Sequence, residues 1–224
     1  MKTFYITLAI IAAVMIIYHF VIRPKMLRRG VTKNETGKRL AGDEIIRPKP
    51  FRSTMAVNLN ACPEDIWPWL VQMGWSKAAF YSYNRIESIL GMDLHNADHI
   101  HPEWQDLNVG DTMWMSHPRR NNLFPITRVE KIKSPKELVF AIYGPEDPDT
   151  KPSGVWSFIL EPIDENQTRL FTRLQVAQPS LKGKLIFYFF MEPAHFIMQQ
   201  GMFKGLKKRL APAPKVEYAE HIHV

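Results

Sequence analysis

Hydrophobic and polar residues follow three patterns along this chain of 224 residues. The first pattern is a run of 19 residues, 4–22, that contains no Asp, Glu, Lys or Arg. A helix rises ~1.5 Å per residue and the hydrocarbon core of a bilayer is ~30 Å thick, so this run is long enough to cross a membrane once. We therefore predict a transmembrane anchor helix over residues 1–22.

The second pattern is alternation between apolar and polar residues, which predicts half-buried β-strands. Over residues 52–60, the side chains of Met55, Val57 and Leu59 share one face of an extended chain. Further stretches of this kind, separated by turn residues, predict strands at 112–115, 124–133, 137–143, 155–162 and 167–176. The six strands are expected to form one antiparallel sheet.

The third pattern is helical spacing. Pro63 and the two acids after it predict the start of a helix that ends at Gly74. A second short helix is expected over residues 83–90. The longest helix is predicted over 193–210, where an aromatic or aliphatic side chain recurs every seven residues, at Phe196, Phe203 and Leu210.

Pro193 is expected to separate the long helix from the apolar run 185–191. That run is too short to span a bilayer, so it either completes the core or dips into the bilayer surface as a lid. We favour the core. Gly201 and Gly205 are four residues apart and are expected to let the helix approach the sheet closely.

The order of these elements predicts an α+β chain with a helix-grip fold, in which a curved antiparallel sheet surrounds a long C-terminal helix. Because the helix does not fill the curve, a cavity is expected between them. The predicted organisation is an anchor at 1–22, a basic juxtamembrane linker at 23–50, one helix-grip domain at 51–210 and a disordered tail at 211–224.

Charge is distributed unevenly along the chain. Residues 1–50 hold 10 Lys or Arg and 3 acids, residues 51–179 hold 12 and 16, and residues 180–224 hold 7 and 3. Since the central domain is mildly acidic, the net charge of +7 does not predict a nucleic-acid partner. The basic flanks instead predict contact with anionic lipid headgroups.

The cations also predict the orientation of the anchor. Seven of them follow the apolar run within residues 23–39, which places this side in the cytoplasm and the N-terminus outside. A cleaved signal peptide is the alternative, but only Lys2 precedes the run and no small-x-small cleavage site follows it. The one cysteine, Cys62, excludes an internal disulfide and fits a reducing compartment. We predict a single-pass protein of the cytoplasmic membrane.

The stretch 66–111 carries a family resemblance. It contains Ile-Trp-Pro-Trp-Leu-Val-Gln-Met-Gly (66–74), Phe-Tyr-Ser-Tyr-Asn (80–84) and His-Asn-Ala-Asp-His-Ile-His-Pro-Glu-Trp (95–104). The chain resembles bacterial proteins of the SRPBCC superfamily from about Gly42 to Arg209. This superfamily shares the fold of START domains and birch-pollen allergens, and it includes lipid carriers, polyketide cyclases and dehydrases. The resemblance implies a helix-grip fold with a ligand cavity, in an uncharacterised membrane-anchored subgroup.

The chain departs from this pattern at three places. Lys77-Ala78-Ala79 stands where the family pattern has Arg-Gly-Gly, Asn84 where an Asp is usual and His99 where an Arg is usual. A role that needs that arginine or that carboxylate is therefore not carried over to this chain.

Aromatic density and one strand cation indicate candidate ligand-binding residues. A pocket lined by rings with a few polar tips is typical of a small-molecule site, whereas ordinary core packing is the alternative for the rings. A solvated outer face of the sheet is the alternative for the cation. The predicted ligand-binding residues are Tyr81, Tyr83, Trp114, Trp156, Phe158, Arg173 and Phe196.

Acid–base candidates are weaker. Glu192 and His195 lie three residues apart at the start of the long helix, where a helix-terminal acid is also expected for electrostatic reasons alone. His95 and His99 have a spacing that can bind zinc on a helix, but Pro102 interrupts the segment and we predict no metal. The weak catalytic candidates are Tyr83, His101, Glu103 and Glu192.

These observations predict a membrane-anchored cytoplasmic domain that binds a hydrophobic or amphipathic small molecule or a lipid, with no cofactor. One alternative is a cyclase- or dehydrase-like enzyme acting on a polyketide- or lipid-like substrate. The other is an assembly partner of another membrane protein. Polar side chains converging in a cavity would favour the enzyme, and a large exposed apolar patch would favour the assembly partner.

Overall fold

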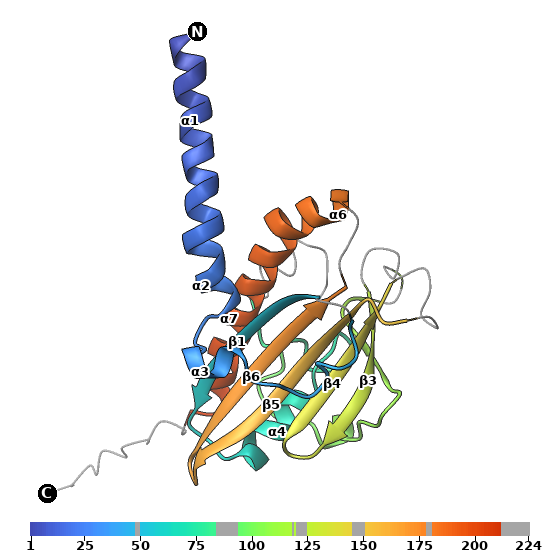
Figure 1. Ribbon diagram of the computed structural model, residues 1–224. Helices are drawn as coiled ribbons and strands as arrows, with labels where there is room; N and C mark the ends of the chain where they lie inside the picture. The colour runs from blue at the N-terminus through green and yellow to red at the C-terminus, as the bar shows by residue number, and fades with distance from the viewer. Residues whose placement is uncertain are drawn as a thin grey trace, which may run out of the picture.

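Six antiparallel strands form one sheet in the computed structural model (Figure 1). The structure describes residues 1–47, 50–83, 94–117, 119, 125–144, 151–177 and 181–211. The strand order is β1-β6-β5-β4-β3-β2. The bounds are Phe51–Leu59 for β1, Thr112–Trp114 for β2, Ile126–Lys133 for β3, Glu137–Tyr143 for β4, Gly154–Asp164 for β5 and Gln167–Val176 for β6. The predicted α+β helix-grip fold is confirmed.

The helices lie at the two ends of the chain and between β1 and β2. One continuous helix contains α1 (Lys2–Ile17), the π-helical turn η1 (Tyr18–Ile22) and α2 (Arg23–Leu27). Among the described residues, this is the one helix long and apolar enough to cross a membrane, a test that signal sequences also pass. The others are α3 (Lys33–Thr36), α4 (Pro63–Val71), a 3₁₀ turn η2 (Pro102–Trp104), α6 (Leu181–Ile186), the π-helical turn η4 (Phe187–Met191) and α7 (Glu192–Arg209).

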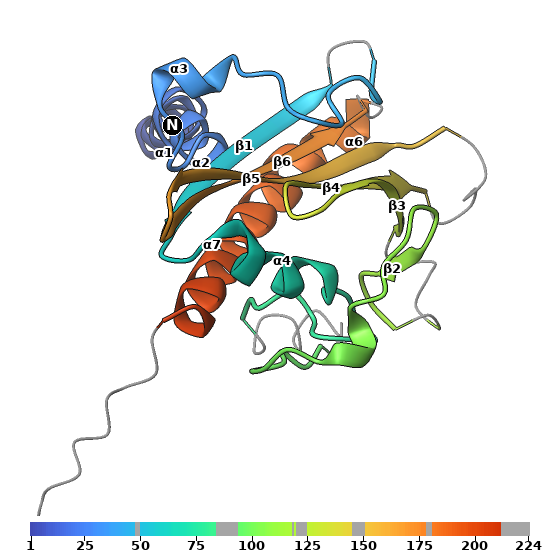
Figure 2. The ribbon, with the colours of Figure 1, turned by 90° about the horizontal axis from the view of Figure 1, so that it is seen from below.

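One face of the sheet packs against α7 and α4 (Figure 2). Because side chains alternate along a strand, every second residue of β4, β5 and β6 points to this face. Phe140, Phe158 and Leu170 are fully buried there, together with Leu206 of α7 and Leu70 of α4. This is the main core that the alternating pattern predicts.

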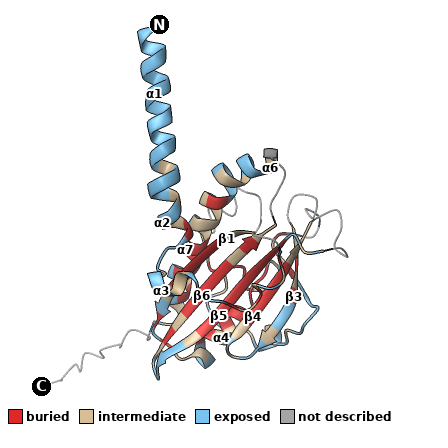
Figure 3. Cartoon of the chain, in the orientation of Figure 1, coloured by how far each residue is buried: buried red, intermediate tan, exposed pale blue. Residues whose placement is uncertain are grey.

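The opposite face of the sheet is covered by the segment between α2 and β1 (Figure 2). Leu40 packs on Ile159 and Phe171, and Ile46 packs on Val139 and Val155. The central strands are therefore buried on both sides, as their colour in Figure 3 shows. The segment predicted as a basic juxtamembrane linker is thus a covering layer of the sheet, because β5 carries apolar side chains on both faces.

Ion pairs fasten this covering layer to the sheet. Arg169 of β6 makes a two-point contact with Glu35, with Nε to Oε1 at 2.9 Å and Nη2 to Oε2 at 2.8 Å. Lys38 pairs with Glu161 on β5. These two ion pairs join four charged side chains across the boundary between the layer and the strands.

The C-terminal helix corrects two predictions. Pro193 does not break the helix, because α6, η4 and α7 are continuous and the wider π-turn η4 precedes the proline. A proline lacks an N–H and its ring clashes with the preceding turn, and a π-turn relieves both constraints locally. The run 185–191 does not complete the core either, because its side chains project beyond the edge of the sheet and are largely exposed (Figure 3).

The two glycines of α7 approach a loop rather than the sheet. A Cβ on Gly205 would lie 2.0 Å from the Tyr81 carbonyl oxygen, and one on Gly201 would lie 2.6 Å from Ser82 Oγ. The predicted helix over 83–90 and the predicted disordered tail fall on residues 84–93 and 212–224, which lie outside the described residues.

Candidate functional site

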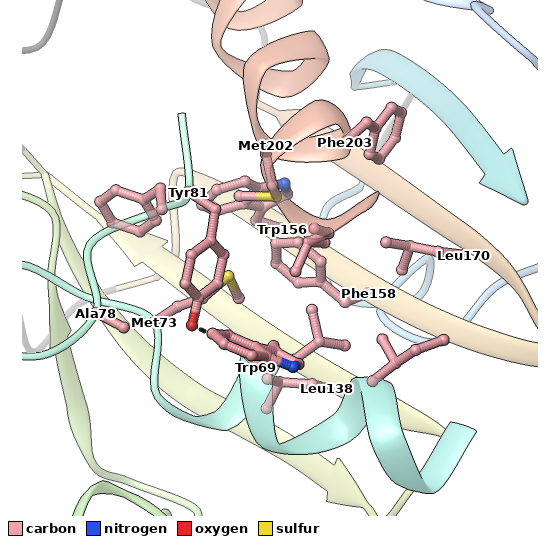
Figure 4. Close-up of a cluster of buried hydrophobic side chains, with 14 of the residues drawn as sticks. Trp69, Met73, Ala78, Tyr81, Leu138, Trp156, Phe158, Leu170, Met202 and Phe203 are labelled. Atoms are coloured by element: carbon pink, nitrogen blue, oxygen red, sulfur yellow. Dashed lines mark hydrogen bonds between the residues drawn. The ribbon is translucent and has the colours of Figure 1, made fainter. Parts of the chain in front are cut away.

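The aromatic residues predicted to line a cavity lie in the main core (Figure 4). Trp156 and Phe158 are two residues apart on one face of β5, with ring centroids 4.7 Å apart, and the ring centroid of Phe80 lies 6.0 Å from that of Trp156. These rings pack on Met202 and Phe203 of α7. The Nε1 of Trp156 has no hydrogen-bond partner among the described residues. The rings therefore pack on one another and on α7.

Tyr81 holds the loop that α7 crosses. Its backbone has a φ of 58°, a left-handed conformation that is uncommon for a bulky residue. Its hydroxyl donates to the Trp69 carbonyl at 2.7 Å, and the two rings meet edge to face at 5.6 Å. Burial raises the pKa of the Tyr81 phenol. Tyr81 thus fixes the loop that follows α4 and lies against α7.

The remaining predicted ring residues lie at separate places. Trp114 is half-buried on β2, the edge strand, and its carbonyl accepts from Trp75 N–H at 2.8 Å. Phe196 packs against the main core from the first half of α7. Tyr83 is half-buried, and its hydroxyl accepts from Lys204 at 3.3 Å.

Arg173 points to the opposite face of the sheet from α7. Its side chain is only 1% exposed, and Nη1 lies 2.6 Å from Asp43 Oδ2. Nε donates to Thr54 and Nη1 also donates to the Lys38 carbonyl. Burial lowers the pKa of this guanidinium, although Asp43 opposes that shift. Arg173 is therefore neither under α7 nor on a solvated face: it holds the covering layer.

The acid–base candidates are dispersed. His101 stacks on Trp104 with centroids 3.9 Å apart, and its Nδ1 lies 3.1 Å from the exposed Glu103. Glu192 belongs to a different region and is paired with Arg23. Within the described residues, no three His, Cys, Asp or Glu side chains are placed to hold a metal ion.

His195, one turn after Glu192, faces the core. Its ring lies 6.5 Å from that of Trp156, edge to face, and burial lowers its pKa to about 4. The imidazole is therefore neutral at physiological pH. Glu192 is paired with Arg23 of the N-terminal helix, whereas His195 lies against Trp156 in the core. The two groups of the predicted pair therefore do not act on one proton.

The N-terminal helix and the C-terminal helix meet in a junction made by two segments of similar sequence. Residues 18–24 read Tyr-His-Phe-Val-Ile-Arg-Pro, and residues 187–193 read Phe-Tyr-Phe-Phe-Met-Glu-Pro. Both segments form a π-turn, followed by a charged residue and then a proline. Because the two charges are opposite, Arg23 and Glu192 pair where the helices cross.

This ion pair has two-point geometry. Arg23 Nε lies 2.6 Å from Glu192 Oε2, and Nη2 lies 2.8 Å from Oε1. Glu192 is 2% exposed. Above the pair, the Tyr18 hydroxyl donates to the Tyr188 carbonyl at 3.2 Å, and His19 Nδ1 lies 2.8 Å from the Tyr188 hydroxyl. The anchor helix is thus joined to the C-terminal helix by specific polar contacts.

An apolar cleft opens above this junction, between α1 and the α6–η4 segment. Its volume is about 480 Å³. The lining is almost entirely apolar, although three of its residues, His19, Lys184 and Tyr188, carry a polar group. The lining residues are Met15, Ile16, His19 and Phe20 from the anchor helix, and Lys184, Leu185, Tyr188 and Phe189 from the C-terminal helix. Sequence reasoning missed this cleft, although the matched Arg-Pro and Glu-Pro endings of two apolar runs were a signal for it.

Comparisons with protein-family models and with curated proteins find no match. Among solved structures, the chain is similar to protein MLL2253 from Mesorhizobium loti, with 17% identity over 70% of this chain and 96% of that one, and a TM-score of 0.41. It is also similar to the Aha1 dimer from Colwellia psychrerythraea, with 18% identity over 70% and 98% and a TM-score of 0.39. Ms6760 from Mycobacterium smegmatis has 13% identity over 71% and 90%, and a TM-score of 0.43. These identities are too low to carry a function from those proteins to this chain.

Proposed function

We propose that this protein is a membrane-anchored domain that binds a hydrophobic or amphipathic molecule of the lipid kind. In this proposal α1 crosses the cytoplasmic membrane once, the N-terminus is outside and the sheet domain is in the cytoplasm. The observation that carries the proposal is the apolar cleft between α1 and the α6–η4 segment.

The lining of the cleft supports an amphipathic ligand. Small-molecule sites are mostly apolar, measure about 300–1,000 Å³ and contain a few polar groups that orient the ligand. The apolar side chains Met15, Ile16 and Leu185 suit an acyl or polyisoprenoid chain. Lys184 belongs to the same lining, and an ammonium group suits a carboxylate or phosphate at one end of such a chain.

The helix-grip fold and the resemblance to the SRPBCC superfamily also favour binding. The weak catalytic candidates lie at three separate places: Tyr83 on α7's flank, the His101–Glu103 pair beside Trp104, and Glu192 at the helix junction. Because acid–base catalysis needs groups within reach of one substrate, this dispersal favours a binding domain over a cyclase or dehydrase.

Native mass spectrometry of the full chain tests the proposal. The protein extracted in mild detergent is expected to retain a lipid-like molecule. The variant Ile16→Trp fills the cleft from α1 and is expected to lower the retained fraction about fivefold or more, since overfilling a packed site costs about 1–3 kcal/mol and 1.4 kcal/mol is tenfold in affinity.

The matched control is Ile11→Trp. Ile11 lies on the same helix with similar exposure, 55% against 58% for Ile16, but outside the cleft. Equal loss of ligand in both variants would contradict the cleft as the binding site. A purified chain whose mass lacks the first 22 residues would contradict the anchor.

A further inference from the structure

The α6–η4 segment exposes an apolar face that the covering layer, the sheet and α7 leave free. Phe190 is 70% exposed, and the neighbouring exposed side chains are Leu185, Ile186, Phe189 and Met191. Outside the anchor helix, the described residues expose only three other large apolar side chains: Val109, Ile163 and Ile197. A contiguous apolar surface of this kind marks an interaction site.

The height of this face relative to the anchor helix can be derived from the cleft. The α1 side of the cleft begins at Met15, seven residues before the end of the apolar run at Ile22. At ~1.5 Å per residue, Met15 lies about 10 Å inside the apolar run. Leu185 and Phe189 line the same cleft and therefore lie within the same 10 Å (Figure 1).

Polar and basic side chains at the base of this face match a membrane–water interface. Tyr18 and Tyr188 meet there with ring centroids 5.3 Å apart, and tyrosines are enriched at the headgroup level. Arg23 and Lys25 follow on the anchor helix. The exposed Lys184 lies farther from this base, in α6, and its long side chain can extend the ammonium toward the headgroups.

The Arg23–Glu192 pair fixes the two helices at this height. Its two hydrogen bonds join the base of the anchor helix to the first residue of α7, and the Arg23 guanidinium also lies 4.9 Å from the Tyr188 ring centroid. If α1 stands in a bilayer, the α6–η4 segment cannot remain in water without breaking this junction.

We propose that residues 184–191 enter the cytoplasmic leaflet as a short interfacial helix beside α1, so that the cleft opens directly into lipid hydrocarbon. This inference rests on the proposed anchor and names the bilayer as the partner of the exposed apolar face. The face is continuous with the lipid-facing surface of α1 across the cleft, and cations border it. A second copy of the chain is a different occupant, which the experiment below distinguishes.

Depth-dependent fluorescence quenching tests this inference on the full chain. In a Cys62→Ser background, Phe190→Cys is labelled with a nitrobenzoxadiazole dye and reconstituted in phosphatidylcholine–phosphatidylglycerol vesicles. Lipids that carry a doxyl quencher on the acyl chain are then added to the bilayer. Quenching at position 190 is expected to lie between that of the same label on Ile11→Cys, in the middle of α1, and that of a label outside the bilayer.

The control label is placed on Ile163→Cys. Ile163 is 48% exposed near the end of β5 that lies far from α6 (Figure 1), so its label is expected to show no quenching by acyl-chain doxyl. Quenching at 190 no greater than at 163, with Ile11 quenched, would overturn the insertion and leave the anchor standing. Failure to quench at Ile11 would overturn the anchor itself. A label at 190 that is shielded only at high protein-to-lipid ratio would assign the face to a second copy and also overturn the proposal.

Discussion

Arg173 shows how far a single residue can be interpreted without its neighbours. The sequence offers two interpretations, a cation for a ligand or a charge on a solvated face. The structure places the guanidinium in the interior, where Thr54 accepts from Nε, and Asp43 and the Lys38 carbonyl accept from Nη1. Breaking a buried pair of this kind by removing one partner costs far more than an exposed pair contributes.

Glu35 gives a prediction at the same scale. The Arg169 guanidinium beside it lowers the pKa of this carboxyl to about 2. Because the folded pKa lies below the unfolded value of 4.5, the pair stabilises the fold above about pH 4.5, and this contribution disappears as the pH falls toward 2. Glu35→Gln is expected to lower the free energy of unfolding by about 1–2 kcal/mol at pH 7 after allowance for solvent screening.

Denaturant unfolding of the full chain in detergent measures this difference. The difference in free energy of unfolding between the natural protein and Glu35→Gln is expected to narrow steadily from pH 5 toward pH 2. Glu165→Gln, at an exposed position in the turn after β5, is the control and is expected to change the free energy of unfolding by less than about 0.5 kcal/mol. A difference in free energy of unfolding that stays constant with pH for Glu35→Gln would be inconsistent with the ion pair.

At the scale of elements, the strands and long helices follow the sequence patterns closely. The predicted strands at 137–143 and 167–176 have the observed bounds of β4 and β6. The spacing of apolar residues and the presence of turn residues are local properties of the sequence, so they identify helices and strands well. Contacts made by the same elements are not local, and the closeness of α7 to the Tyr81 loop could not be derived from its two glycines alone.

Gly205 provides a prediction for this contact. Alanine favours an isolated helix over glycine by about 1 kcal/mol. In this protein the added Cβ would meet the Tyr81 carbonyl oxygen at 2.0 Å, so Gly205→Ala is expected to destabilise the fold by about 3 kcal/mol. The thermal midpoint of the full chain measures the change.

The control is Gly37→Ala, which adds a Cβ where no atom lies within 4 Å. Its effect on the free energy of unfolding is expected to stay within about 0.5 kcal/mol. Stabilisation by Gly205→Ala would show that α7 does not lie against the loop as described.

At the scale of the whole molecule, the N-terminal helix, the covering layer and the C-terminal helix form one connected unit. The covering layer leads directly from α2 to β1 and is held by Glu35, Lys38 and Asp43. The Arg23–Glu192 pair closes the connection on the other side of the sheet. The domain is therefore attached to the N-terminal apolar helix at two places.

A charge exchange tests this attachment. Glu192→Gln leaves Arg23 without its partner, so spin-label distances between Ile11→Cys and Ile163→Cys, both in the Cys62→Ser background, are expected to broaden. The double variant Arg23→Glu with Glu192→Arg is expected to narrow the distribution again. Glu161→Gln removes the more exposed Lys38–Glu161 pair and should leave the distance distribution unchanged. Identical distributions in all variants would argue against the junction.

The sequence by itself determined the elements, their order, the helix-grip fold class and the presence of a helix apolar enough to span a bilayer. These features depend on the length and period of short stretches. Only the tertiary structure decided which faces are covered and where the open cleft lies. Arg23 and Glu192 are 169 residues apart, and they pair only because the fold brings α2 beside the start of α7. The candidate site is made of residues from both ends, so no local pattern could specify it.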